Sequence, residues 1–187
     1  MSVASRCSRL LLLLAVALVS SGCVNQTIKS ASVPEVNTSA REVPEALLLD
    51  VGINIFDPGL DETDEDELIY PEVRRAEARY MPYILLEAIQ SSAAWGAVRV
   101  IPSDQQIMDI VVAGTIVNST GEQLELKIIA RDSRGKVWLN KGYRSKASKY
   151  SYSATTRARI DPFQAIYNRI ANDLLEQLLK RDTEELA

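Results

Sequence analysis

The sequence predicts an α+β domain, with a mixed, mostly antiparallel sheet of about five strands and two amphipathic helices packed on one face. Three observations lead to this fold. Apolar and polar residues alternate over 47–56, which is the period of a half-buried strand. Apolar residues recur every three or four positions over 70–94 and 163–178, which is the period of an amphipathic helix. Three strand-like runs over 109–145 are separated by turns that contain glycine, as in an antiparallel meander.

The first strand is expected in the run LLLDVGINIF, from Leu47 to Phe56. Its buried face is expected to hold Leu49, Val51, Ile53 and Ile55. A turn at Pro58-Gly59 follows, and then the run from Asp61 to Glu67, which contains six acids in seven residues. An EF-hand calcium loop starting at Asp61 would need glycine where Asp66 stands. We therefore expect a solvated acidic loop.

A helix is expected from Tyr70 to Ala94. Its apolar stripe is expected to comprise Val73, Ala76, Tyr80, Met81, Ile84, Leu85, Ala88 and Ile89. Pro82 lies inside this stretch and removes one backbone donor, so the pattern predicts a kink or two abutting helices. A short strand from Val98 to Ile101, closed by Pro102, is expected to follow.

The meander is expected to turn at Asn118–Gly121 and at Asp132–Gly135, because glycine tolerates a positive φ. The middle strand is expected to bury Leu124, Leu126, Ile128 and Ala130, leaving the other side of the sheet largely wet.

The last helix is predicted to begin with Asp161 as its cap, Pro162 in the first position and Gln164 completing a capping box. Its stripe is Phe163, Ile166, Ile170, Leu174 and Leu178. Lys180 and Arg181 complement the dipole at its carboxyl end.

The amino-terminal segment has the features of a secretory leader. Arg6 and Arg9 precede an apolar run of ten residues, Leu10 to Val19, about half of the ~20 that a membrane-spanning helix needs. The residues SSGC, Ser20 to Cys23, resemble the lipobox of bacterial lipoproteins. That resemblance implies acylation of Cys23, including palmitate, and the absence of aspartate at Val24 implies retention in the outer membrane. The alternative is an ordinary signal peptide cut near Gly22, which would leave a free thiol.

These segments predict four parts. Residues 1–22 are a signal peptide, 23–44 a lipidated tether, 45–181 a single periplasmic α+β domain, and 182–187 a polar tail.

The composition excludes several classes of function. The chain has 21 basic and 25 acidic residues, and loss of Arg6 and Arg9 with the leader leaves 19 against 25. An acidic exported chain is a poor binder of nucleic acid, so no nucleic-acid partner is expected. The chain has no histidine, which removes the usual general base and the commonest zinc ligand. No spacing of acids nominates a catalytic pair either, so we expect no enzymatic activity, no cofactor and no metal site.

A basic segment from Lys141 to Arg159 is the candidate binding region. It contains no acid, and its tyrosines are of the kind enriched at protein contact surfaces. The partner-binding candidates are Lys141, Tyr143, Arg144, Lys146, Lys149, Tyr150 and Tyr152. Four other interpretations stay open: a mobile basic loop, a site for anionic headgroups or cell-wall carboxylates, a contact with the acidic run of a neighbouring copy in a homo-oligomeric ring, and the same contact within one chain.

The phrases LLLDVGINIF, LLEAIQSSAAWGAVRVIP, DIVVAGTIV and RDSRGKVWLNKGY resemble the envelope-lipoprotein domain related to the TolB amino-terminal domain, over about residues 45–181. That group includes the curli-secretion lipoprotein, the lipoprotein activators of penicillin-binding proteins, and the auxiliary lipoproteins of lipid-transporting ABC systems. The resemblance implies a non-catalytic lipoprotein anchored in the outer membrane, with its domain in the periplasm, that serves an envelope assembly as an accessory or scaffold and binds an envelope protein. The alternative is a lipid-binding auxiliary lipoprotein of an ABC-type lipid transport system.

Overall fold

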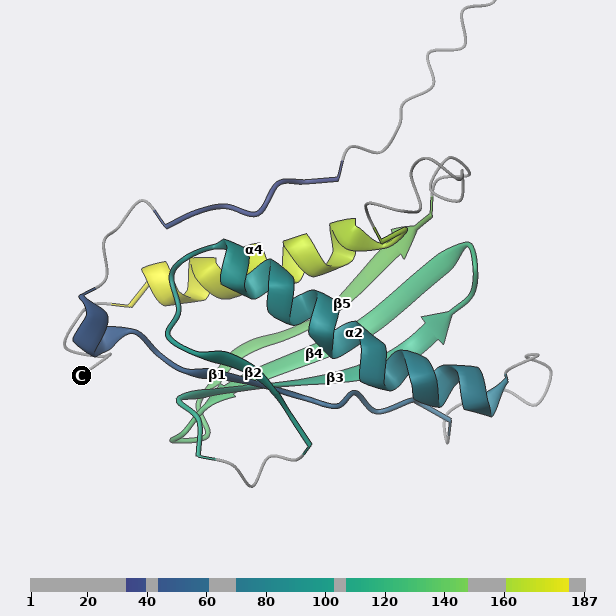
Figure 1. Ribbon diagram of the computed structural model, residues 1–187, viewed down its shortest axis with the longest axis horizontal. Helices are drawn as coiled ribbons and strands as arrows, with labels where there is room; N and C mark the ends of the chain where they lie inside the picture. The colour runs from purple at the N-terminus through teal and green to yellow at the C-terminus, as the bar shows by residue number, and fades with distance from the viewer. Residues whose placement is uncertain (1–32, 40–43, 61–69, 103–106, 148–160, 182–187) are drawn as a thin grey trace, which may run out of the picture. The chain divides into compact units, whose positions relative to one another are not determined.

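The computed structural model describes residues 33–39, 44–60, 70–102, 107–147 and 161–181 (Figure 1). Its elements, in chain order, are η1 (Glu45–Leu47), β1 (Val51–Asn54), α2 (Pro71–Ser91), β2 (Val98–Ile101), β3 (Ile110–Ser119), β4 (Gln123–Asp132), β5 (Val137–Lys146) and α4 (Gln164–Leu179). The five strands form one mixed sheet, which confirms the predicted fold class. The leader, Cys23, the acidic run and the polar tail lie outside the described residues.

The strand order is β2-β1-β3-β4-β5, so the first strand lies inside the sheet rather than at its edge. Val51 of β1 pairs in parallel with Val98 of β2 on one side and with Ile110 of β3 on the other. The β3, β4 and β5 strands pair antiparallel, as the meander predicts. Gly135 has φ of +82°, as its predicted turn requires. Gly121, in the other predicted turn, does not have a positive φ.

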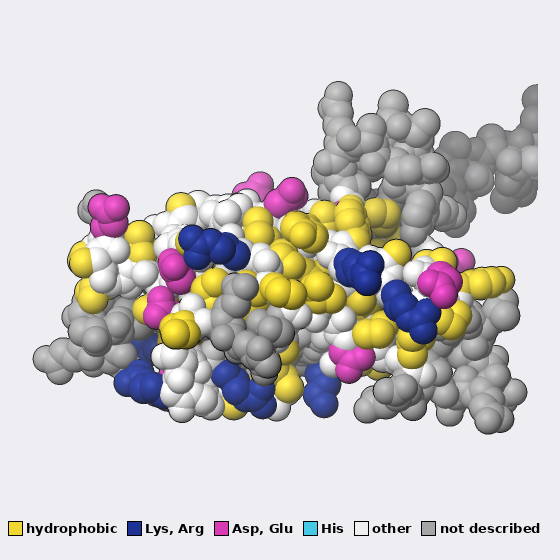
Figure 2. Space-filling model, turned by 60° about the horizontal axis from the view of Figure 1, so that its bottom comes forward, with side chains coloured by type: hydrophobic (Ala, Val, Ile, Leu, Met, Phe, Trp, Pro, Cys, Tyr) yellow, Lys and Arg dark blue, Asp and Glu magenta, His cyan; other side chains and the backbone are white. Residues whose placement is uncertain are grey.

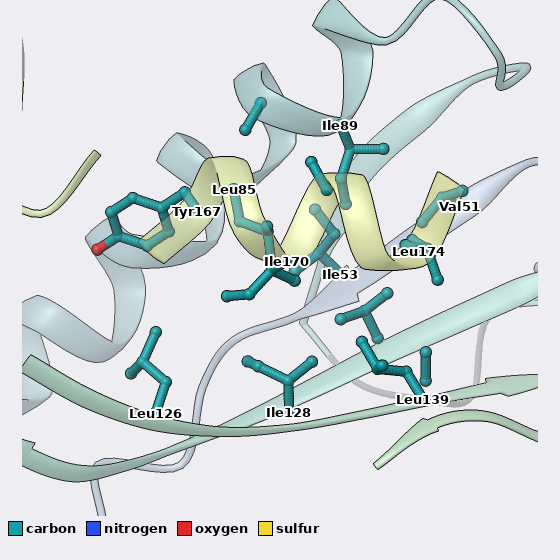
Figure 3. Packing of buried hydrophobic residues seen from close by; sticks show 14 of the residues in the cluster. Val51, Ile53, Leu85, Ile89, Leu126, Ile128, Leu139, Tyr167, Ile170 and Leu174 are labelled. Atoms are coloured by element: carbon teal, nitrogen blue, oxygen red, sulfur yellow. The ribbon is translucent and has the colours of Figure 1, made fainter. Parts of the chain in front are cut away.

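Both helices lie on the same face of the sheet (Figure 1). The inward side chains of β4 are completely buried, as predicted: Leu124, Leu126, Ile128 and Ala130. Tyr167 and Ile170 of α4 and Leu85 and Ile89 of α2 meet above them (Figure 3). Full burial of each such aliphatic side chain contributes roughly 1.5–3 kcal/mol, so this layer is the main source of stability.

The first strand is shorter than expected, and its end is different. Regular pairing begins at Val51 and ends at Asn54, Ile55 is exposed, and Phe56 is buried instead. The Ile55 amide still donates to the Ile101 carbonyl, but the Phe56 amide donates to Ala78 of α2. The prediction for Ile55 was therefore wrong, because the Phe56 amide bonds to the helix and the alternation of faces breaks before Asp57 pairs again with β3.

The buried stripe of α2 also differs from the prediction. It is made by Arg74, Ala78, Met81, Pro82, Leu85, Ala88 and Ile89. Val73, Ala76 and Tyr80 were expected to be buried, and all three are exposed. The buried face runs through Arg74, whose Nη1 lies 3.4 Å from the Ile116 carbonyl and 3.5 Å from that of Pro58. Because arginine is polar, hydrophobic periodicity does not place it in a buried stripe, and the predicted stripe is therefore on the wrong side in this half of the helix.

Pro82 interrupts the helix's hydrogen bonds without dividing the helix. The helix α2 is continuous from Pro71 to Ser91, so the alternative of two abutting helices is wrong. Proline has no amide hydrogen, so the Ala78 carbonyl has no donor four residues later. This carbonyl accepts the Phe56 amide at 3.0 Å instead. The gap that Pro82 makes in the helix is therefore the point at which the segment after β1 is attached.

The start of α4 is also different from the prediction. The helix begins at Gln164, and Asp161 closes a turn before it by accepting the Phe163 amide at 2.8 Å. The Gln164 side chain donates to Asn168 and makes no capping box. At the other end, Arg181 donates to the Gln177 carbonyl, which agrees with the predicted complement to the helix terminus.

Phe56 and Gly114 give a direct test of this packing. A Cβ added at Gly114 would lie 2.7 Å from two ring carbons of Phe56, which is itself buried. Because the ring is rigid and enclosed, Gly114→Ala is expected to destabilise the fold by about 1–3 kcal/mol. Gly142→Ala is the matched control, since its Cβ would meet nothing within 4 Å. Urea unfolding of both variants measures this, and equal stability would contradict the packing described.

Candidate docking surface

The structure places the first residues of the basic segment on β5, the edge strand beside α4. Tyr143 is buried, and its hydroxyl donates to Asp173 Oδ2 of α4 at 2.6 Å. Lys141 Nζ donates to the same oxygen at 2.6 Å. Burial, followed by the hydrogen bond and the charge of Asp173, raises the pKa of Tyr143. These two candidates thus attach β5 to α4 within the domain.

The other described members of the segment are more exposed. Arg144 Nη2 lies 2.6 Å from Glu125 Oε2 on the outward face of the sheet. The Arg144 carbonyl accepts Arg169 Nη2 of α4 at 2.6 Å. Lys146 is exposed at the end of β5. Lys149, Tyr150 and Tyr152 lie outside the described residues, so the prediction of a binding strip is tested for none of its members.

A second surface lies on the outer side of α2, and it includes Val73, Ala76 and Tyr80, which were expected in the core. Tyr70, Val73, Tyr80 and Tyr83 are each more than half exposed. Val73, Ala76, Tyr80 and Tyr83 are spaced by three or four residues, so they lie on one side of the helix. We call these four residues the tyrosine face. The helix α2 thus has two apolar sides, of which one is buried and one is exposed.

Tyr80 is partly fixed by the turn before α4. Its hydroxyl forms a hydrogen bond with Asp161, and burial, the charges of Asp161 and Glu87, and this bond raise the pKa of the phenol. Burial also raises the pKa of Asp161, against hydrogen bonds from the Phe163 amide and from Tyr80 that lower it. The tyrosine face is therefore adjacent to the amino-terminal end of α4.

Residues 33–39, which were expected to belong to the tether, lie against α4 as an extended segment that we call the strap (Figure 1). Asn168 Nδ2 donates to the Pro34 carbonyl at 2.8 Å, and Asn172 Nδ2 donates to the Glu35 carbonyl at 2.9 Å. The Asn37 amide donates back to Asn172 Oδ1 at 2.7 Å. Two asparagines one helical turn apart thus hold the main chain of the strap. Val36 of the strap is also partly buried and packs against the hydrophobic core.

Figure 2 shows one face on which hydrophobic side chains form a broad band, with lysines, arginines and acids beside it. Contiguous exposed apolar surface on a folded domain is typical of contact sites.

Within the described ranges, no group of three or more potential ligand side chains could hold a metal ion. Among the same residues, no helix has both the length and the apolar character that a membrane span requires.

The described elements define an α+β domain in which two helices cover one face of a five-stranded mixed sheet. No protein-family model matches the chain, and no curated protein matches it either. The resemblance to TolB-related envelope lipoproteins therefore stays a prediction.

Solved structures match the chain at low identity and with TM-scores below 0.5. A PelC variant from Paraburkholderia phytofirmans, described as a dodecamer, has 14% identity and a TM-score of 0.46, with 76% of this chain and 93% of that chain covered. Protein XCC0632 from Xanthomonas campestris has 14% identity and a TM-score of 0.46, with 80% and 92% covered. A hypothetical protein from Chlamydia trachomatis, CT253, has 14% identity and a TM-score of 0.35, with 69% and 94% covered. Likeness at this level does not decide the function.

The buried tyrosines predict how stability changes with pH. Burial is the main cause that raises the pKa of both Tyr143 and Tyr167 above the value of about 10 expected in the unfolded chain. A phenol that holds its proton more tightly when folded stabilises the fold fully below pH ~10, and this contribution is lost as the pH rises further. The loss is at most about 1.4 kcal/mol per pH unit for each tyrosine.

The variant Tyr143→Phe is therefore expected to flatten the decline in unfolding free energy above pH ~10. Urea unfolding at a series of pH values up to about 11.5 measures the slope. Tyr83→Phe, which alters an exposed ring, is the matched control. An unchanged slope in Tyr143→Phe would show that this hydroxyl does not govern the transition.

Proposed function

We propose that this protein is a non-catalytic periplasmic lipoprotein, anchored in the outer membrane through acylated Cys23. In this role it binds an envelope protein through the tyrosine face of α2 and acts as an accessory or scaffold of an envelope assembly. The single observation that supports binding is the tyrosine face itself, whose rings are more than half exposed on a helix with its opposite side in the core.

The chemistry of this face suits a protein partner. Tyrosine buries a large area with few rotatable bonds, so a partner gains contact at a low cost in conformational entropy. The same helix carries both charge signs, since Glu72 pairs with Arg75 at 3.0 Å beside the tyrosine face. An apolar centre with a charged rim is the usual composition of a protein interface.

The proposed anchor rests on the leader and the SSGC sequence that ends in Cys23. A single acyl chain holds a protein weakly, and several chains together hold it for long periods. An anchored domain encounters partners in the same membrane or just above it, which favours a scaffold of modest affinity.

The alternative of a lipid carrier would require an apolar cavity between the helices and the sheet. In the described residues this layer holds the side chains of Ile53, Leu85, Ile128, Ile170 and Leu174, which are at most 1% exposed (Figure 3). A layer filled in this way favours the scaffold over the carrier.

The anchor is tested by replacing Cys23. The Cys23→Ala chain, expressed in its native cells, is expected to leave the membrane fraction, and mass spectrometry of the wild-type protein is expected to find an acylated amino-terminal cysteine at residue 23. Retention of Cys23→Ala in the membrane as firmly as wild type, or a wild-type thiol without acyl chains, would contradict the proposed anchor.

The docking face is tested by crosslinking in cells. A photo-crosslinking residue at Tyr83 is expected to give discrete adducts with one or a few envelope proteins. The same residue at Lys127, which is exposed on the outward face of β4, is the matched control. Adducts at both sites alike, or at neither, would remove the support for this face.

A further inference from the structure

The strap determines where the tether leaves the domain. Its first described residues lie beside Asn168, near the start of α4, and its last, Ser39, donates its amide to the Ser92 carbonyl at the end of α2. The strap therefore runs along α4 in the direction of the helix. Without the strap contacts, the folded domain would instead begin near η1.

The length of chain between the anchor and the domain follows from the same contacts. Cys23 and Val33 are ten residues apart in the sequence, which allows a reach of at most about 35 Å. If the strap were released, the free chain would extend from Cys23 to Glu45, with a reach of about 75 Å. The strap thus halves the reach and selects the end of α4 that the tether pulls toward the anchor.

The end selected by the strap carries exposed cations. Arg169 Nη2 reaches the Arg144 carbonyl on β5, and Lys146 ends the same strand. Acids lie at this end as well. Glu125 pairs with Arg144, and Glu122 contacts Ala147 next to Lys146 through its carbonyl. Asp161 precedes α4. Exposed Tyr80 forms its hydrogen bond with Asp161 at the same end. Cations attract anionic lipid headgroups by about 1 kcal/mol each, and tyrosine favours the membrane interface.

From the place where the tether enters and from this charge, we infer that the strap holds the domain with the start of α4 facing the bilayer, and that Lys146 and Arg169 bind anionic headgroups there. This inference rests on the proposed acylation of Cys23. The strap is then an orienting device, and the end of α4 near Lys180 faces away from the lipid.

The test measures the distance of two points on the domain from a bilayer. The acylated chain is placed in vesicles of phosphatidylcholine with one-fifth phosphatidylglycerol and headgroup-quencher lipids. A fluorophore is attached through Glu35→Cys, on the strap, or through Lys180→Cys, at the end of α4. Quenching at least twofold stronger at position 35 is expected, whereas equal or reversed quenching would overturn the orientation.

Two further variants separate the strap from the charge. Asn168→Ala with Asn172→Ala removes the two side chains of α4 that hydrogen-bond the strap, and it is expected to abolish the difference between positions 35 and 180. Asn140→Ala, on exposed β5, is the matched control and keeps the difference. If the strap variant, shown by circular dichroism to be folded, also keeps it, the strap does not orient the domain.

Lys146→Glu is expected to weaken quenching at position 35 by at least twofold with phosphatidylglycerol and to have no effect in phosphatidylcholine alone. No effect in either would overturn headgroup binding by this end. The failure of the anchor itself gives a different result, because a chain without acyl groups fails to float with the vesicles before any quenching is measured.

Discussion

A main-chain hydrogen bond joins α2 to the segment that follows β1. Pro82 leaves the Ala78 carbonyl without a partner inside α2, and the Phe56 amide takes that place. The bond brings the Phe56 ring onto Gly114, where no larger residue would leave space for it. The following residue, Asp57, then bridges to Thr115 of β3. A residue that usually weakens a helix here provides the point at which the helix is joined to the sheet.

The other helix, α4, also binds the main chain of a segment outside it. Asn168 and Asn172 use their amide groups to bind the main chain of the strap rather than to face solvent. Asp173, one position further on, accepts both Tyr143 and Lys141 of β5. The helix α4 therefore binds the sheet edge with one side and the segment before the domain with another. The tyrosine face lies on the outer side of α2, beside the turn that precedes α4.

Much of the fold could be predicted from the sequence because its periods are clear where one side is buried. The alternation of Leu124, Leu126, Ile128 and Ala130 gave the inward face of β4 correctly. The pattern of apolar residues failed at Arg74, because hydrophobic periodicity does not identify an arginine that is buried with carbonyl partners as part of the core. It failed again at Ile55, where a tertiary hydrogen bond redirects the chain.

The candidate site was less predictable than the fold. The composition indicated a basic binding segment, yet the Tyr143 hydroxyl in that segment donates to Asp173 within the domain. Val73 and Tyr80 were expected in the core, yet both side chains are exposed. Helical spacing alone does not say which of two apolar sides of α2 is buried. Most contacts of the strap are made by its carbonyls and an amide, which leave no trace in the sequence, and Val36 alone gives too short a pattern to predict its packing against the core.

The pairing of β1 with partners from distant parts of the chain has a consequence for the order of folding. The two hairpins of β3, β4 and β5 join neighbouring residues and close with little loss of chain entropy. The parallel contacts of Val51 with Val98 and Ile110 must wait until α2 is in place, and such non-local contacts are slow to form. The strap needs α4, the last element of the chain. The strap can therefore form only after α4 has packed, so the residues at 33–39 are among the last of the described chain to join the fold.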